Sequence, residues 1–161
     1  MSVWLHHPQL HSCLGEDLAS AAQRVIAGQL PQPDTFTVHE RDQRLPCLSA
    51  RPQLTLEQRL HAMLEPIRQA TGSLAGHLLI VASSGLDITG FEQLTCERGH
   101  FKAEYSTPPH SIASALQHDY GFAASLTLNT ACSSAANALI YGARLLPQYQ
   151  GVVVLAFEPA S

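Results

Sequence analysis

The chain has 161 residues, of which 45% are hydrophobic and 14% charged, and this composition is typical of one folded domain, here residues 1–161. Its formal net charge of −4 provides no positive field for nucleic acid, so no nucleic-acid partner is expected. Its longest apolar runs are far shorter than the about 20 residues that a transmembrane helix needs, so no membrane span is expected either.

The first part of the chain predicts few regular elements. A short strand is predicted over residues 2–5, and a helix over residues 15–27, where apolar side chains recur at helical spacing. Residues 31–53 contain four prolines among polar residues, which favours a loop or extended segment over a helix. A second amphipathic helix is predicted over residues 55–70, and Pro66 should kink or end it.

From residue 76 the pattern alternates between strands and helices. Residues 76–82 form an unbroken apolar run of the kind that suits a strand buried on both faces. A helix that begins near Pro109 and ends before Gly121 is followed by a strand at residues 124–129, a helix to about Leu146 and a strand at residues 151–157. This order predicts a layered α/β domain with a mostly parallel, buried sheet.

The cysteines indicate no metal or redox site. Their positions are irregular and include no CxxC pair: Cys13, Cys47, Cys96 and Cys132. Cys96 and His100 could share a metal, but no second pair completes a tetrahedral set, so neither a metal nor a cofactor is expected. The N-terminus does not resemble a signal peptide, and we expect reduced thiols and a cytoplasmic location.

Other polar residues are weaker candidates. His6, His7 and His110 could act as metal ligands or bases, but surface or turn positions are the favoured interpretation. Ser83-Ser84-Gly85 could bind a phosphate, but no P-loop spacing follows it, so a turn is the favoured interpretation.

Residues 125–139 are the most informative stretch of the chain. A strand ends there, a tight turn follows, and a helix begins at Cys132 or just after it. A thiol at a helix N-terminus meets the positive end of the helix dipole and free N–H groups, which favour a thiolate and can stabilise an oxyanion. The helix that follows is small or apolar around nearly its whole circumference, which predicts burial on all sides.

Two alternatives to this nucleophile hypothesis follow from the same residues. Free cysteines are commonly buried, so Cys132 could be a structural thiol. It could also pair with a distant histidine in a cysteine hydrolase, because such partners meet only in the folded protein.

A resemblance adds to these observations. Thr130-Ala131-Cys132-Ser133-Ser134, followed by Ala-Ala-Asn-Ala-Leu, resembles the nucleophile motif of β-ketoacyl-acyl-carrier-protein synthases in the thiolase-like superfamily. Residues 109–121 and residues 77–85 are similar to the elements before that motif in the family. Residues 151–156 with Glu158 are similar to the strand after it, although Phe157 and Pro159 depart from the family's glycine-rich end. The similarity is strong over residues 76–161 and weak before residue 60.

The resemblance implies the N-terminal half of a thiolase-like layered α/β fold, with residues 1–161 as a β-ketoacyl synthase N-terminal-like domain. It implies that Cys132 accepts an acyl group from an acyl carrier protein, and that a malonyl carrier protein then condenses with it as carbon dioxide leaves. The implied pathway is fatty acid or polyketide biosynthesis.

In the family the catalytic histidines lie in the C-terminal half. All nine histidines of this chain precede Cys132, and none lies in a matching motif. We therefore expect the histidines to come from outside this chain, the isolated chain to be inactive in condensation, and the chain to form a homo- or heterodimer with a ketosynthase-like subunit. The alternative is a non-catalytic, chain-length-factor-like partner that stabilises a complete ketosynthase.

Overall fold

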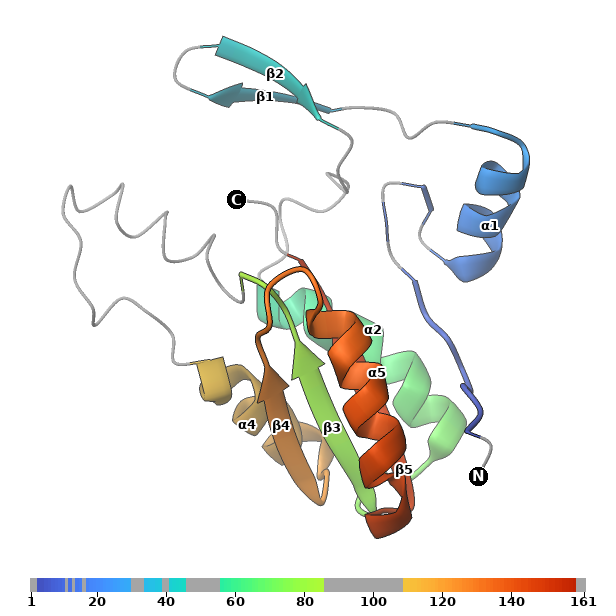
Figure 1. Cartoon of the computed structure of the whole chain (residues 1–161), viewed down its shortest axis with the longest axis vertical. Helices are drawn as coiled ribbons and strands as arrows, with labels where there is room; N and C mark the ends of the chain where they lie inside the picture. The colour runs from blue at the N-terminus through green and yellow to red at the C-terminus, as the bar shows by residue number, and fades with distance from the viewer. Residues whose placement is uncertain are drawn as a thin grey trace, which may run out of the picture. The chain divides into compact units, whose positions relative to one another are not determined.

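A computed structural model describes residues 3–10, 12, 14–15, 17–29, 34–38, 41–45, 56–85 and 109–158 (Figure 1). The chain divides into two compact units, Met1–Thr55 and Leu56–Ser161, and each is described here by itself. The expectation of a single domain over residues 1–161 stays a prediction.

The first unit contains one helix and one hairpin. Helix α1 spans Leu18–Ile26 and begins after Asp17, whose side chain accepts a hydrogen bond from the backbone N–H of Ser20 at 2.8 Å. Strands β1 (Asp34–Val38) and β2 (Arg41–Leu45) pair antiparallel, in agreement with an extended rather than helical segment. The strand predicted at residues 2–5 is wrong for residues 3–5, because they pair with no described strand and their side chains are exposed.

The second unit begins with helix α2, which spans Leu56–Thr71 and contains Pro66. The prediction that Pro66 could end this helix is wrong. Proline removes the hydrogen bond to the carbonyl four residues earlier, that of Ala62, and both residues are exposed, so water can bind the freed carbonyl oxygen. The buried positions Leu60 and Leu64 lie one turn apart and hold the helix on the sheet.

Three parallel strands form the sheet of this unit. Strand β3 (His77–Ala82) lies between β4 (Ala124–Leu128) and β5 (Gly151–Ala156), and it pairs with both in parallel. Residues 78–82 are all buried, which is why this strand carries an unbroken apolar run. The prediction of a mostly parallel sheet with a buried strand at residues 76–82 is confirmed for the described residues.

Helices cover both faces of the sheet. On one face, α2 and α4 (Pro109–Tyr120) pack against a core cluster of ten buried residues: Leu60, Leu64, Leu74, Leu79, Val81, Ala113, Leu116, Phe122, Val153 and Leu155. On the other face, α5 (Ser134–Leu145) packs against Leu78, Ile80 and Ala82 through Ala138, and a short 3-10 helix, η2 (Leu146–Gln148), follows it. Because the chain moves outward from β3 to β4 and then back across the sheet to β5, a constant crossover hand requires α4 and α5 on opposite faces.

Helix α5 differs from its prediction. It buries Ser134, Ala138 and Gly142, which form one stripe along the helix, whereas Leu139, Ile140 and Tyr141 are between 44% and 49% exposed. The prediction of burial on all sides is therefore wrong for this chain, because the sheet covers only one side of the helix. The uncovered side is nevertheless apolar.

Candidate functional site

The carboxyl ends of the three parallel strands meet at one edge of the sheet. Ser83 and Ser84 follow β3, residues 129–133 follow β4, and Glu158 lies just beyond β5. Parallel strands bring such segments together, and in open α/β sheets ligands commonly bind at this edge. The site is therefore built from the connections that leave these strand ends.

Cys132 lies in the turn between β4 and α5, two residues before the first residue of the helix. Its side chain is exposed and its thiol is free. Ala131 adopts a positive φ of 52°, a left-handed conformation that costs a residue with a side chain about 1–2 kcal/mol. The turn thus stores strain at the residue next to the thiol and presents the thiol outward.

The buried side chain of Ser134 supports this turn through hydrogen bonds. It is 1% exposed, and its hydroxyl accepts a hydrogen bond from the Thr130 N–H at 2.9 Å. The same hydroxyl donates to the Ala131 carbonyl at 2.7 Å, with the Ser83 carbonyl at 3.3 Å as a second acceptor. One buried side chain therefore holds Thr130 and Ala131 in place and joins them to Ser83 at the end of β3.

The outer side of the turn is held by a second set of hydrogen bonds. The Asn137 amide donates to the Thr130 hydroxyl at 2.8 Å and to the Ser133 hydroxyl at 3.2 Å. The Ser133 hydroxyl in turn donates to the Thr130 carbonyl at 2.7 Å. These contacts brace the turn against the first turn of α5.

The ends of β3 and β5 are also joined by side chains. Glu158 accepts hydrogen bonds from the N–H of Ser84 at 2.9 Å and from its hydroxyl. Asn129, at the end of β4, donates to the Ser84 carbonyl at 3.2 Å. Sequence reasoning did not assign these roles to Asn129 and Glu158, although each is a polar residue that directly follows a strand end or nearly so. Ser83-Ser84-Gly85 forms a turn at this edge of the sheet.

Two amides next to Cys132 are already occupied. The Ser133 N–H donates to the Thr130 carbonyl at 3.3 Å, and the Ser134 N–H donates to the Ala131 carbonyl at 3.0 Å. The expectation that these first N–H groups are free for an oxyanion is therefore wrong for Ser133 and Ser134. Both N–H groups already form the backbone hydrogen bonds that close the turn.

Three histidines of the second unit whose side chains the structure describes lie far from Cys132 along the strands. His77 is the first residue of β3, His61 contacts Tyr120 just before the start of β4, and His118 lies in the last turn of α4. These positions belong to the amino ends of the strands, whereas Cys132 follows a carboxyl end. Within the described residues, no side chain forms a hydrogen bond with the Cys132 thiol.

The remaining sequence candidates divide into two groups. His6 and His7 lie in the first unit, exposed and with ring centroids 6.4 Å apart. Four candidates lie outside the described residues, as does the side chain of His110: Cys13, Cys47, Cys96 and His100.

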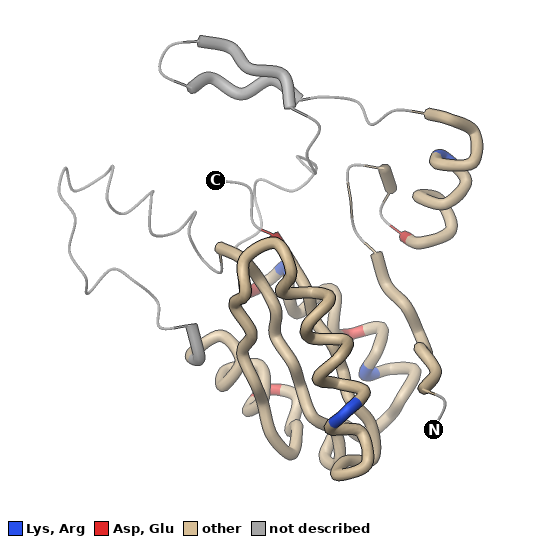
Figure 2. Tube along the Cα trace, viewed as in Figure 1, with Lys and Arg blue, Asp and Glu red and all other residues tan. Residues whose placement is uncertain are grey.

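The site and its surroundings carry little charge. Arg144 is the only charged residue between residues 121 and 157, and the trace of this region in Figure 2 is almost entirely uncharged.

Among the described helices, none combines the length and hydropathy that crossing a bilayer requires. Comparison with protein-family models and with curated proteins found no match to this chain.

Proposed function

We propose that this chain is the N-terminal half of a β-ketoacyl-acyl-carrier-protein synthase-like protein, in which Cys132 carries the acyl group. The observation that carries the proposal is the exposed thiol at a strained strand-to-helix turn, where three parallel strands end. A nucleophile needs exposure to reach a carbonyl and a rigid support to hold its direction, and Ser134 and Asn137 provide that support.

The proposed reaction has two stages. In the first, the Cys132 thiolate attacks an acyl thioester, the tetrahedral intermediate collapses, and the thiolate of the acyl carrier protein leaves. In the second, a malonyl thioester loses carbon dioxide, and its carbanion attacks the acyl group and releases Cys132. The carbanion needs hydrogen-bond donors near the thioester carbonyl. The donors described around Cys132, those of Ser133, Ser134 and Asn137, already bond within the turn, so in this proposal the histidines come from outside the chain.

The uncovered side of α5 supports the partner in this proposal. Ile140 and Ala143 lie on the side opposite the buried Ala138 and Gly142, so the helix has apolar side chains on two faces. A helix with two apolar faces is typical of a layer that lies between two others. We propose that the second layer is a ketosynthase-like C-terminal half, from a longer chain or from a dimer partner, in a thiolase-like arrangement.

Strand β4 supports the same proposal. It is at an edge of the three-stranded sheet, and the residues that the structure describes pair only with its β3 side. Its five residues are only partly buried, and an edge strand with Leu126 and Leu128 favours pairing with another strand. A ketosynthase-like subunit that adds a strand here would continue the sheet.

The experiment measures acyl transfer to Cys132 with and without a complete ketosynthase subunit. We expect mass spectrometry to find an acyl adduct on the Cys132 peptide after incubation with acyl-acyl carrier protein, and none in a Cys132→Ser variant. The isolated chain should give no β-ketoacyl product when malonyl-acyl carrier protein is added. Absence of the adduct both with and without the partner would contradict the proposal.

The same experiment addresses the chain-length-factor-like alternative, which is favoured because no histidine of this chain lies in a matching family motif. If the chain raises the turnover of a complete ketosynthase, and Cys132→Ser raises it equally, the role is structural. If Cys132→Ser abolishes the gain, Cys132 is the nucleophile.

A further inference from the structure

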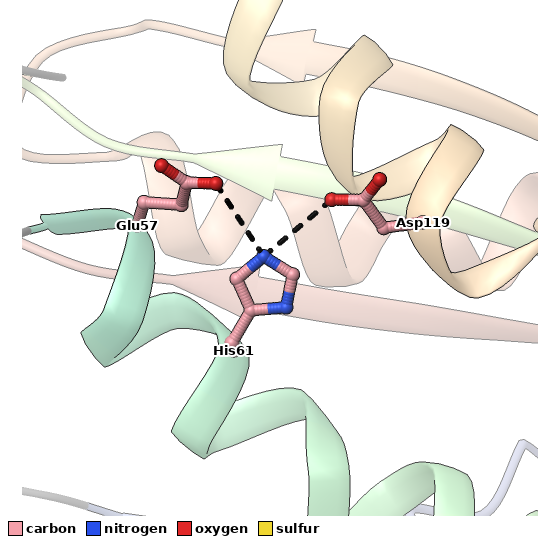
Figure 3. A group of neighbouring side chains, drawn as sticks. All are labelled: Glu57, His61 and Asp119. Atoms are coloured by element: carbon pink, nitrogen blue, oxygen red, sulfur yellow. Dashed lines mark ion pairs between the residues drawn. The ribbon is translucent and has the colours of Figure 1, made fainter.

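Three side chains converge between α2 and α4, apart from the Cys132 turn. Glu57 and His61 lie one turn apart on α2, and Asp119 extends toward them from the last turn of α4 (Figure 3). His61 Nε2 lies 3.5 Å from Asp119 Oδ2 and 3.9 Å from Glu57 Oε1. One ligand atom from each residue lies within 4.8 Å of the others. Two carboxylates are therefore directed at one imidazole nitrogen.

The two contacts of the Tyr120 hydroxyl fit one tautomer of His61. The Tyr120 hydroxyl donates its single proton to the backbone carbonyl of His61 at 3.1 Å, and its oxygen lies 3.0 Å from His61 Nδ1. Both contacts are hydrogen bonds only if Nδ1 is the donor in the second. In that tautomer the Nε2 lone pair faces Glu57 and Asp119. Three electron-rich atoms face each other, and a cation between them would relieve their repulsion.

We propose that Glu57, His61 and Asp119 bind a divalent transition-metal ion, with Zn²⁺ as the best match. Imidazole nitrogen and carboxylate oxygen are normal Zn²⁺ ligands, and tetrahedral bonds of about 2.0–2.1 Å place neighbouring ligand atoms about 3.3 Å apart. Asp119 is close to that separation from His61. The Glu57 side chain, 77% exposed, is free to rotate inward. Water can fill the fourth position.

Charge and the outer contacts agree with this assignment. Two carboxylates balance the charge of a divalent ion, so the loaded cluster is neutral. The hydrogen bond between His61 Nδ1 and the Tyr120 hydroxyl is an outer contact of the kind that orients metal-binding histidines. The Tyr120 ring also stacks on His61, with ring centroids 5.3 Å apart. The ring of His61 is thus held in the direction that metal binding requires.

The ion would join two helices at a defined place in the fold. Asp119 and Tyr120 end α4, and the chain then passes through Gly121 to β4. Binding at this position would fix α2 to the segment that leads into β4. The proposal is independent of the acyl chemistry at Cys132, which lies at the opposite end of that strand.

The test is a calorimetric titration of the metal-free full chain with Zn²⁺. We expect one ion per chain, and affinity at least tenfold weaker in Glu57→Gln and in Asp119→Asn, since even outer-contact changes cost about 10–100-fold. Tyr120→Phe should weaken binding about tenfold through the outer contact. His118→Gln is the matched control, because His118 is an exposed histidine next to Asp119, and it should bind as the unchanged chain does.

Glu57 is exposed and Asp119→Asn keeps the side-chain shape, so both variants should fold, and circular dichroism checks this. Zn²⁺ should also raise the melting temperature of the unchanged chain and of His118→Gln, but not that of the two ligand variants. Equal affinity in the unchanged chain and in both ligand variants would place the ion on other histidines or cysteines and overturn the proposal. So would the absence of saturable binding.

Discussion

Gly142 of α5 packs closely against the sheet, and a larger side chain there should push the helix and the sheet apart. A Cβ atom at this position would lie 3.3 Å from Val152 Cγ1, 3.5 Å from Val154 Cγ2 and 3.7 Å from Ile80 Cδ1. A single methyl group therefore fills the available space. Gly142→Leu adds three further carbons, which have no room unless the helix moves.

Two opposing contributions set the size of the change in the free energy of unfolding. Overpacking a core contact costs about 1–3 kcal/mol, whereas replacing a helical glycine by leucine gains about 0.8 kcal/mol of helix propensity. The net cost spans about 0.2–2 kcal/mol, and because leucine adds three carbons to a space that one methyl group fills, we expect the upper half of that range, a loss of about 1–2 kcal/mol in the free energy of unfolding. The matched control is Ala143→Leu, because Ala143 is the next residue along and is exposed. Its change should stay within about 0.5 kcal/mol, as for most surface substitutions.

Urea unfolding followed by far-ultraviolet circular dichroism measures the free energy of unfolding of the unchanged chain and of both variants. With a urea dependence of about 2 kcal/mol per molar, the midpoint of Gly142→Leu should fall by about 0.5–1 M. Equal midpoints for Gly142→Leu and Ala143→Leu would refute the reasoning, because they would show that α5 is not in close contact with β5 at this residue.

Three other predictions concern the turn, the charges and the outer face of α5. Ser134→Ala should destabilise the chain by about 1–3 kcal/mol in urea melts, because it leaves the N–H of Thr130 without its acceptor. The hydrogen bond from Arg68 lowers the pKa of Glu65 from 4.5 to about 2, so the contribution of this pair is complete above pH 4.5 and is lost as the pH falls toward 2. An NMR titration should find this low pKa in the unchanged chain and a value near 4.5 in Arg68→Gln. Ile140→Asp should leave the melting temperature nearly unchanged and abolish co-purification with a ketosynthase-like subunit; retained co-purification would place the interface elsewhere.

The sequence predicted most elements of the second unit because their patterns are local. The apolar run of β3 and the recurring apolar residues of α2 identify each element without knowledge of its neighbours. The number of layers around α5 depends on what packs against it, which no local pattern records. Apolar residues on two faces of α5 therefore predicted burial that this chain alone does not provide.

The candidate site was predictable only in part for the same reason. The position of Cys132 between a strand and a helix followed from residues close to it in sequence. The contacts of Glu158 with Ser84 and of Asp119 with His61 join residues far apart in the chain, and they depend on strand order and helix packing. No spacing rule in the sequence identifies such pairs.

The central place of β3 in the sheet has a consequence for the chain during its synthesis. Residue 78 of β3 pairs with residue 124 of β4, and residue 77 pairs with residue 151 of β5. At about 5–20 residues per second, the ribosome delivers β4 about 2–9 s and β5 about 4–15 s after β3. Hydrophobic collapse takes far less than a millisecond. Throughout that interval one of the most apolar segments of the chain has an open edge, so we expect nascent chains to depend on chaperones that bind extended apolar peptides until β5 emerges.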